Sequence, residues 1–415
     1  MVEQYFSAPK TLRRMRGGPC SAYLDGFVES LRRDGYTPTS IRRSLRAATH
    51  LGVFLTRRRQ SVADLDAATL DAFGRHLFHC RCRQSSGRRT GYHGRFGAQR
   101  FHTYLITRGV CRRPTVGAPP AALPPLVVAF TAWYQTHRGA TQPTLRHYAR
   151  GATGMLDALG PDVRAWTPQA VRQFLLTALR KGRPASTQQL ITATRAFVRY
   201  LAFRGEARPD LAVAIPAIAR WRLASLPRHL TADQLARVLA ACEGDAPARV
   251  RDRAIVLLLA RLGLRAGDVQ RLRLADLDWE HGTILVTGKG RYQVRLPLPQ
   301  DVGEAVAQYL LCRPSRPETD RVFLSMIAPI TPLHSADAVP SLVARALARA
   351  DVRVARPGAH ILRHTAATEM LRHGVSLDHI GLVLRHRSLD VSAYYAKVDV
   401  ATLRQVAQPW PGRRS

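Results

Sequence analysis

Two sequence blocks recur, in the same order, within the first half of the chain, and this repeat constrains the fold more than any other feature. The block that begins at Gly35 matches the block that begins at Gly139 without a gap, and a shorter block at Phe101 matches one at Phe197. Chance seldom preserves both the similarity and the order of two blocks. We therefore expect two copies of one structural unit in this half of the chain.

Both copies of the longer block are predicted to be helices. Thr37 and Thr141 stand where a side chain can cap a first turn, and a proline lies within the first turn after each of them. The apolar residues of the first copy recur at helical spacing: Ile41, Leu45, Ala48 and Leu51. A helical domain is therefore expected in each copy.

Arginines fill much of the opposite face of both predicted helices, and four of them occupy equivalent positions: Arg42 with Arg146, and Arg46 with Arg150. An arginine-rich helix face is more often a solvated surface than a binding site. Here the repetition, together with the charge of the whole chain, favours contact with phosphate groups. We predict that these four arginines bind DNA.

The chain carries a formal net charge of +34, and its basic residues are spread along the whole sequence. Such a charge predicts a polyanionic partner, with nucleic acid as the first candidate. A membrane is the competing partner, but the longest apolar run, Ala254 to Ala260, has seven residues and is too short to span one. Because the N-terminus lacks the apolar stretch of a secretory signal, we expect a cytoplasmic protein without a membrane partner.

Two connectors divide the chain. A Pro/Ala-rich segment, Thr115 to Pro125, separates the two copies, and a second connector near Arg222 to Pro227 precedes a predicted capping box at Thr231 to Gln234. The predicted parts are an N-terminal tail (1–18), a first helical domain (19–114), a linker (115–125), a second helical domain (126–222) and a third domain (228–415).

The third domain is predicted to be mostly helical with one small antiparallel sheet. The segment Gly282 to Leu298 has β-rich flanks around Gly288, Lys289 and Gly290, which indicates a hairpin with its turn at the lysine. Helical patterns return from Ala336 to the end of the chain.

Cleavage of a phosphodiester needs several kinds of group. The transition state gains negative charge that preorganised donors must stabilise, and the planar fork of arginine suits two phosphate oxygens at once. A nucleophile and an acid for the leaving oxygen are also needed. The third domain offers candidates for these tasks: Arg265, Lys289, His360, Arg363, His386 and Tyr395.

These six residues occur in the order and approximate spacing of the tyrosine recombinase (phage integrase) family, which the third domain closely resembles. The second helical domain looks like the core-binding domain of that family. The resemblance implies a mainly α fold, with helical N-terminal DNA-binding domains and an α-rich catalytic domain that carries a small antiparallel β-sheet. It also implies that no metal or nucleotide cofactor takes part, and that a homotetramer, or a mixed recombinase tetramer, assembles on two synapsed double-stranded DNA sites.

The resemblance further implies a role for each of the six residues. Tyr395 would attack the scissile phosphate to form a 3′-phosphotyrosyl link, while both arginines and both histidines would hold the phosphate oxygens. Lys289 would protonate the departing 5′-oxygen. Its residue type supports this role separately, because only four of the 63 basic residues are lysine and an amine can release a proton that a guanidinium keeps.

Some assignments have competitors or open questions. Tyr394 is the rival nucleophile, although the nine-residue step from His386 favours Tyr395. Asp268 resembles an acidic residue that supports the first arginine of the family, and its spacing would let it orient that guanidinium. Arg385 stands where many family members have glycine, which could alter the backbone there or add a phosphate contact.

Metal sites are not expected. His360 and His364 are four residues apart, but the glutamate of an HExxH motif and an evident third ligand are missing. Cys80 and Cys82 are separated by one residue, which is not the spacing of a zinc knuckle. Reduced thiols are the expected state of the cysteines.

Together these features predict a site-specific DNA recombinase or integrase of a mobile element, acting in integration, excision or transposition. A type IB topoisomerase, which nicks and reseals one duplex with similar residues, is one alternative. A catalytically silent, sequence-specific DNA-binding protein is the other. The tandem helical repeat favours a recombinase over a topoisomerase, and the intact set of six residues argues against a silent protein.

Overall fold

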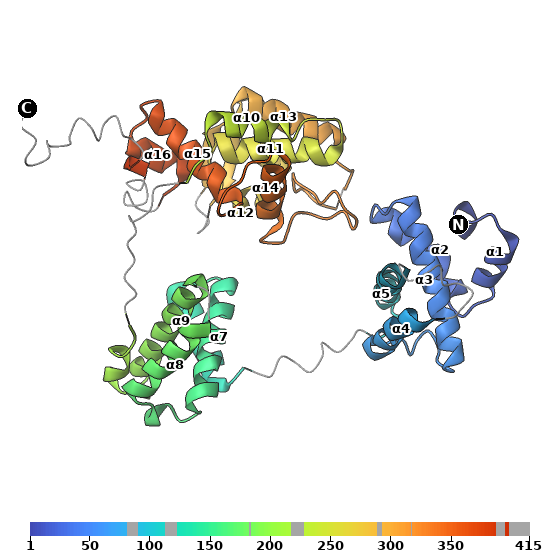
Figure 1. The fold of residues 1–415 in the computed structure, drawn as a ribbon, viewed down its shortest axis with the longest axis horizontal. Coiled ribbons are helices and arrows are strands. Elements are labelled where there is room, and N and C mark those ends of the chain that lie inside the picture. The colour runs from blue at the N-terminus through green and yellow to red at the C-terminus, as the bar shows by residue number, and fades with distance from the viewer. Residues whose placement is uncertain are drawn as a thin grey trace, which may run out of the picture. The chain divides into compact units, whose positions relative to one another are not determined.

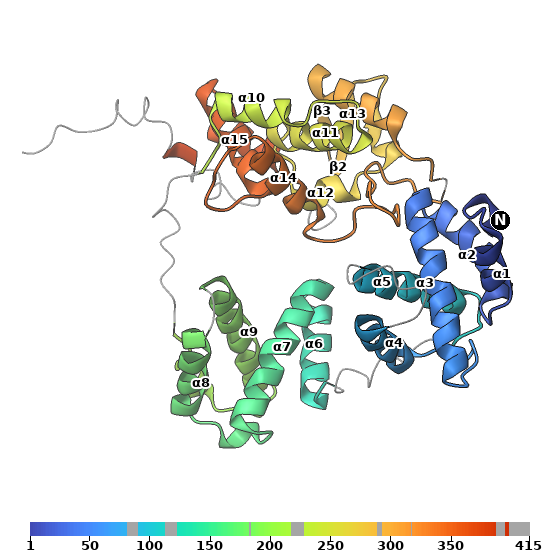
Figure 2. The same cartoon turned by 45° about the vertical axis from the view of Figure 1, so that its right-hand side comes forward.

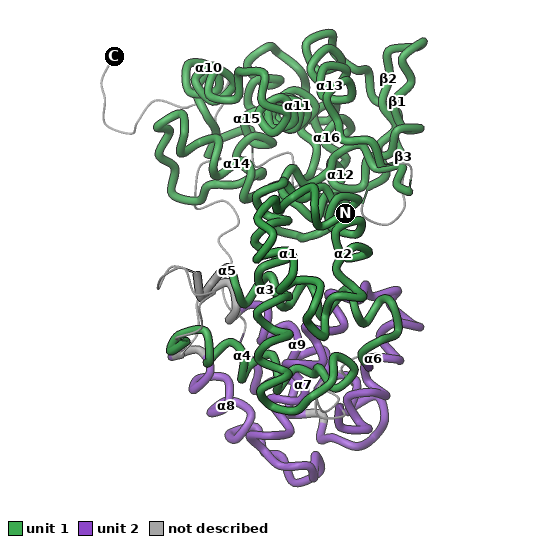
Figure 3. Tube along the Cα trace, turned by 90° about the vertical axis from the view of Figure 1, so that its right-hand side faces the viewer, with its two compact units in different colours: residues 1–111, 222–415 green, residues 112–221 purple. Residues whose placement is uncertain are grey.

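The computed structural model describes residues 1–80, 90–112, 123–181, 184–216, 228–288, 293–316, 318–386 and 395–397. These residues are mainly helical (Figure 1) and include one small antiparallel sheet, as predicted. They form two compact units, 1–111 together with 222–415, and 112–221 (Figure 3). No helix of the described residues is long and apolar enough to cross a membrane.

The described residues among the first 111 form a helical bundle with its own apolar core. Its elements are η1 (Val2–Gln4), α1 (Pro9–Arg16), α2 (Ser21–Arg33), α3 (Pro38–Arg57), α4 (Ala67–His79) and α5 (Thr90–Thr107). As predicted, the Thr37 side chain caps α3 by accepting a hydrogen bond from the Ser40 amide. Although this bundle has a separate core, the Ile330 amide donates to the Asp34 carbonyl oxygen at 3.0 Å, so the bundle also contacts the third part of the chain.

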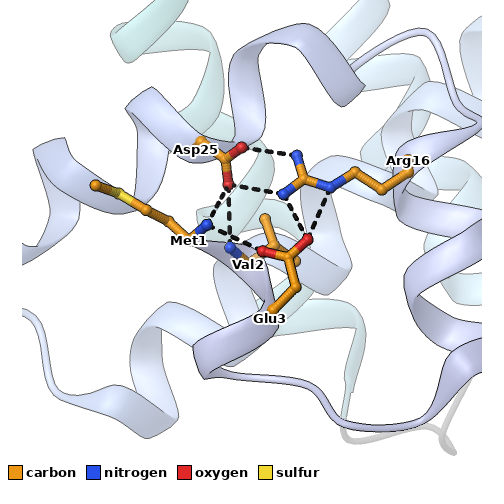
Figure 4. A network of polar contacts seen from close by, with 5 residues as sticks. All are labelled: Met1, Val2, Glu3, Arg16 and Asp25. Atoms are coloured by element: carbon orange, nitrogen blue, oxygen red, sulfur yellow. Dashed lines mark hydrogen bonds and ion pairs between the residues drawn. The ribbon is translucent and has the colours of Figure 1, made fainter.

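Residues 1–18 do not form a tail outside this bundle, and that prediction was wrong. Val2 and Met15 are completely buried in its core. The Arg16 guanidinium donates to Glu3 at 2.6 Å and to Asp25 at 2.7 Å, so it joins the first residues to α2 (Figure 4). Buried Val2 and Met15, together with this ion-pair network, hold the N-terminal residues on the bundle. The boundary after residue 18 was predicted only from where the repeated unit begins.

The second unit contains α6 (Pro125–Arg138), α7 (Gln142–Leu159), η2 (Val163–Ala165), α8 (Pro168–Lys181), α9 (Pro184–Phe203) and η3 (Pro209–Ala212). Phe130 and Phe197 are fully buried at its centre, with ring centroids 5.0 Å apart. Thr141 is the N-cap residue of α7, but its hydroxyl contacts Thr144 Oγ1 at 3.1 Å and no backbone amide, so the predicted side-chain cap is absent here.

The repeat corresponds to the same helix pair in both copies, because α3 packs against α5 and α7 packs against α9. The two alignments equate Ala47 with Gly151, and Gly97 with Ala193. A Cβ atom added at Gly97 would lie 2.6 Å from the Ala47 Cβ, and one added at Gly151 would lie 2.6 Å from the Ala193 Cβ. Each copy therefore keeps one close glycine–alanine approach between its helices, although the two residues have exchanged places.

The third part of the chain surrounds the apolar helix α11 (Pro247–Arg261), which contacts α13, α14 and α15 (Figure 2). The other helices are α10 (Ala232–Ala240), α12 (Ala266–Arg271), η4 (Leu274–Asp276), α13 (Gln300–Cys312), α14 (Ala338–Arg349), α15 (Ala359–Arg372) and α16 (Leu377–Leu384). The predicted capping box opens α10, where Thr231 and Gln234 exchange hydrogen bonds between side chain and backbone. The prediction missed α13, which lies between the hairpin and Ala336.

The sheet contains β1 (Leu277–Asp278), β2 (Thr283–Thr287) and β3 (Gln293–Pro297) in that order, all antiparallel. Strands β2 and β3 form the predicted hairpin, in which Thr287 pairs with Gln293. Its turn, including Lys289, lies outside the described residues. The two-residue strand β1 was not predicted, because a segment that short carries no periodic pattern.

Candidate active site

Arg363 lies at the centre of the candidate site, on the buried face of α15. Only 6% of its surface is exposed, and its guanidinium donates to the main-chain carbonyl oxygens of Gly263 and Leu384. Burial, followed by the nearby Arg265, lowers the pKa of Arg363 to about 10. The side chain is held in place by neutral carbonyl groups, so most of its positive charge is uncompensated.

Gly263 makes this arrangement possible. Its backbone has a φ of +58°, a conformation that favours glycine, and an added Cβ atom would lie 2.3 Å from a methyl carbon of Leu384. The absence of a side chain therefore lets the turn before α12 pack closely against the end of α16, and the two carbonyl groups that hold Arg363 come from these segments.

Arg265 is the N-cap residue of α12, and its Nη2 donates to the carbonyl oxygen of Arg385 at 2.9 Å. Asp268 is buried and accepts from the Arg265 amide at 3.2 Å. We expected this carboxylate to orient the Arg265 guanidinium, but it contacts the Arg265 backbone instead. The carboxylate also accepts from Arg271 Nη2 at 2.9 Å and from Arg385 Nη2 at 2.8 Å.

Arg385 ends α16 in the left-handed conformation, with a φ of +55°. Glycine adopts this conformation most readily, which gives a physical reason for the glycine that many family members have at this position. Its side chain is only 4% exposed and is directed toward Asp268. Its Nε and Nη1 atoms are buried, and neither has a hydrogen-bond partner among the described residues.

Tyr395 lies against two histidines. Its hydroxyl is 2.9 Å from Nδ1 of His364, and its ring is stacked on that of His386, with an interplanar angle of 5° and centroids 6.1 Å apart. His360 is one helical turn before His364 on α15, and their ring centroids are 6.3 Å apart. The tyrosine is 2% exposed and packs with Ala367 and other apolar residues of α15 and α16.

Burial, with nearby positive charges second, favours neutral imidazoles. Burial lowers the pKa of His364 and of His386 to about 4, and in His386 the charges of Arg363 and Arg265 act in the same direction. Desolvation and the same two arginines also lower the pKa of His360. At neutral pH each of these rings can donate one N–H group and accept at its other nitrogen.

A cavity of about 1050 Å³ opens beside these groups, and Arg265, His360, Arg363 and His364 contribute to its lining. The described part of the chain thus brings two guanidinium groups and three imidazoles to one region and places a tyrosine hydroxyl beside one of the imidazoles. Such a set can hold an anion and supply a nucleophile.

His364 was not among the predicted site residues. Its four-residue spacing from His360 placed both on one face of a helix, but the pair was considered as possible metal ligands. Contact with Tyr395 depends on the path of the chain between α16 and the tyrosine, and sequence spacing does not specify that path.

The remaining predicted residues lie elsewhere. Lys289 and Tyr394 fall outside the described residues. Arg42 and Arg46 are exposed on α3, where Arg42 Nε donates to the Tyr5 carbonyl oxygen at 3.0 Å and Arg46 lies over the Phe6 ring at 5.4 Å. The other two predicted DNA-binding residues, Arg146 and Arg150, are exposed on α7.

Comparison with known proteins is consistent with this site. A sequence profile of the Phage integrase family matches residues 228–402. The chain is 33% identical to the putative integrase/recombinase y4rA of Sinorhizobium fredii (strain NBRC 101917 / NGR234), and the match covers 99% of each chain. The chain belongs to the phage integrase family. It is also 30% identical to the tyrosine recombinase XerD of Xanthomonas axonopodis pv. citri (strain 306), over 66% of this chain and 92% of XerD.

Solved structures share the fold of this family member. The XerH site-specific recombinase in a post-cleavage complex with a palindromic difH substrate matches with a TM-score of 0.55 at 20% identity, over 67% of this chain and 83% of XerH. The lambda integrase(75-356) dimer bound to a COC′ core site matches with a TM-score of 0.52 at 19% identity, over 66% of this chain and 96% of the integrase chain. At these identities the likeness establishes the fold alone.

Proposed function

We propose that this member of the phage integrase family is a site-specific DNA recombinase that breaks and rejoins strands through a 3′-phosphotyrosyl intermediate. One observation carries the proposal. The Tyr395 hydroxyl lies 2.9 Å from His364 beside a cluster in which neither Arg265 nor Arg363 has a carboxylate partner among the described residues. Uncompensated guanidinium groups next to a nucleophile suit a phosphodiester substrate.

In the proposed reaction, the Tyr395 oxygen attacks the scissile phosphorus and the bond to the 5′-oxygen breaks. The tautomer of His364 that carries its proton on Nε2 can accept the tyrosine proton at Nδ1. Arg265 and Arg363 bind the non-bridging oxygens, while His360 and His386 donate hydrogen bonds to them. Because Tyr395 is only 2% exposed, the phosphate can reach it only after DNA binding uncovers the hydroxyl.

Lys289 is the proposed general acid, which gives its proton to the departing 5′-oxygen. In the sequence, Lys289 lies between the described strands β2 (Thr283–Thr287) and β3 (Gln293–Pro297). The freed 5′-hydroxyl of a second strand then attacks the phosphotyrosine and releases Tyr395. One phosphoester bond is broken and one is formed in each step, so the exchange conserves the bond energy without a nucleotide cofactor.

The proposed substrate is a pair of double-stranded DNA sites held together by four recombinase chains, in integration, excision or transposition of a mobile element. The solved relatives of similar fold include an integrase of the Tn1549 transposon in complex with circular intermediate DNA, with a TM-score of 0.52 at 17% identity. Exposed Arg146 and Arg150 on α7, and Arg42 and Arg46 on α3, are proposed to contact phosphates of the bound duplex.

The direct test is detection of a covalent protein–DNA adduct. Purified protein is incubated in EDTA with labelled DNA from both flanks of its own gene, and denaturing gels separate protein-linked strands. Wild type and the Tyr394→Phe variant should form the adduct, and Tyr395→Phe should bind the same DNA without forming it. Loss of the adduct only in Tyr394→Phe would move the nucleophile, and tight binding by wild type without any adduct would contradict the proposal.

A second substrate tests Lys289 separately. If the 5′-bridging oxygen at the scissile phosphate is replaced by sulfur, the leaving thiolate needs no proton. Lys289→Ala should lose cleavage of ordinary DNA and regain most of it with the sulfur-containing DNA, whereas Arg363→Ala should be inactive with both. A Lys289→Ala variant that stays inactive with the sulfur-containing DNA would contradict the role of general acid.

A further inference from the structure

A second cluster of reactive side chains lies in the N-terminal bundle, far along the sequence from the candidate active site. His50 is buried on α3, His76 is on α4, and Cys80 is the C-cap residue that follows α4. His50 Nε2 lies 3.3 Å from His76 Nε2 and 3.4 Å from Cys80 Sγ. The three potential ligand atoms all lie within 4.8 Å of one another.

The two separations that involve His50 Nε2 match those of ligands around one tetrahedral zinc ion, and the ligand atoms of His76 and Cys80 lie within 4.8 Å of each other. Typical Zn–N and Zn–S bonds at tetrahedral angles place two nitrogens about 3.3 Å apart, and a nitrogen and a sulfur about 3.5 Å apart. The two contacts of His50 Nε2 agree with both values. His76 is in the last turn of α4 and Cys80 is its C-cap residue, so both lie at the end of α4 and contact His50 of α3.

Hydrogen bonding alone explains the cluster less well. In a neutral imidazole, one ring nitrogen carries either a single proton or a single lone pair. His50 Nε2 has two close polar neighbours, His76 Nε2 and Cys80 Sγ, and it cannot make a good hydrogen bond with both. A metal ion between the three atoms would use the lone pairs of both histidines and the thiolate together.

The repeat provides an independent comparison. The alignment that equates Gly35 with Gly139 places Gly154 at the position of His50. Gly154 lies in α7, the counterpart of α3, and the second copy therefore lacks this ligand. The first copy has His50 where the second copy has Gly154. Packing of the helix pair therefore does not by itself require a histidine at this position.

We infer that His50, His76 and Cys80 bind a zinc ion that joins α3 to the end of α4 in the N-terminal bundle. Thiolate and imidazole ligands select zinc over the harder magnesium and calcium ions. The described residues supply three ligands, and water is the proposed fourth. This site departs from the expectation of reduced thiols without metal. His50 lies 26 residues before His76 and 30 residues before Cys80, and sequence spacing did not reveal these contacts.

The test uses the full chain, purified through a tag that does not bind metal and without chelators. Elemental analysis should find about one zinc ion per chain. After the zinc is removed and cobalt(II) is added under reducing conditions, the protein should show a thiolate-to-cobalt charge-transfer band in the near ultraviolet and the visible bands of tetrahedral cobalt. Histidines elsewhere in the chain cannot produce the thiolate band.

Two matched variants identify the thiol. Cys80→Ser should lose the charge-transfer band and bind zinc at least about tenfold more weakly. Cys312→Ser, which removes another half-buried free thiol, should keep both properties. A charge-transfer band that persists in Cys80→Ser would overturn the assignment. Circular dichroism checks the fold of each variant. If Cys80→Ser does not fold, the wild-type protein alone still decides: the proposal is overturned if it contains no zinc and shows no charge-transfer band with cobalt(II).

Discussion

Replacing Asp268 by Asn removes one negative charge from a buried cluster of cations. The Arg385 guanidinium that faces it is 4% exposed and would remain charged without a carboxylate partner. Breaking a buried ion pair from one side typically costs about 3 to 5 kcal/mol. We expect Asp268→Asn to lower the free energy of unfolding of this part of the chain by about that amount.

Replacing Arg385 by Gly should cost much less. The pair is lost, but Asp268 keeps its hydrogen bonds from Arg271 at 2.9 Å and from the Arg265 amide at 3.2 Å. Glycine also relieves the left-handed conformation at φ +55°, which is worth about 1 kcal/mol. We expect a net loss of about 1 to 2 kcal/mol in this variant.

The double variant tests the pairing directly. Once Arg385 is glycine, Asp268→Asn no longer leaves a buried unpaired guanidinium at that position, so its cost should shrink by about 2 kcal/mol. Urea titration of the full chain, read by hydrogen exchange in peptides of α12 and α16, separates this transition from that of residues 112–221. If the two single costs simply add, or if Asp268→Asn is as mild as Arg385→Gly, the reasoning is refuted.

Three further predictions concern the same region. Burial holds the pKa values of His364 and His386 at about 4 in the DNA-free protein, below the usual 6.5, so the unfolded chain binds more protons between these values and stability should fall as pH drops from 6.5 toward 4. After allowance for partial exposure the loss should be about 1 kcal/mol per histidine, and His364→Gln should reduce the slope of unfolding free energy against pH. Gly263→Ala should lower the thermal midpoint, since its Cβ would lie 2.3 Å from Leu384 and its φ is +58°; an unchanged midpoint would contradict this packing. Arg363→Lys should reduce adduct formation about 100-fold while DNA affinity changes little, because an ammonium cannot replace a bidentate fork; near-normal adduct yield would argue against phosphate contact by this residue.

Sequence patterns predicted the parts of the fold that depend on residues close together in the sequence. The capping box at Thr231 and the cap at Thr37 depend on residues three positions apart, and the β2–β3 hairpin depends on alternation around a glycine-rich turn. The repeat predicted matching helix pairs, and the close approach of Gly97 to Ala47 shows why such a pair tolerates little change at its crossing point. The N-terminal segment was misjudged, because burial of Val2 and Met15 depends on partners contributed by later helices.

In the candidate site, too, the sequence predicted some features and left those that depend on tertiary contacts unpredicted. The order of its residues could be predicted from the resemblance to a family, but their partners could not. Asp268 and Arg385 are more than one hundred positions apart, and neither pattern nor propensity pairs them. The position of His364 beside Tyr395 depends on how α15 and the chain after α16 pack together, which is a tertiary property.

The hydrogen-bond partners of Arg265 and Arg363 explain how these side chains are held in place while their positive charges are not neutralised. Arg363 and Arg265 donate to main-chain carbonyl oxygens of Gly263, Leu384 and Arg385, and these neutral groups fix the side chains without cancelling their charge. The one carboxylate described in contact with this cluster, Asp268, instead pairs with Arg385 and Arg271. An incoming phosphate would therefore meet guanidinium groups already oriented and still charged, and its binding would offset the desolvation that lowers the pKa of Arg363.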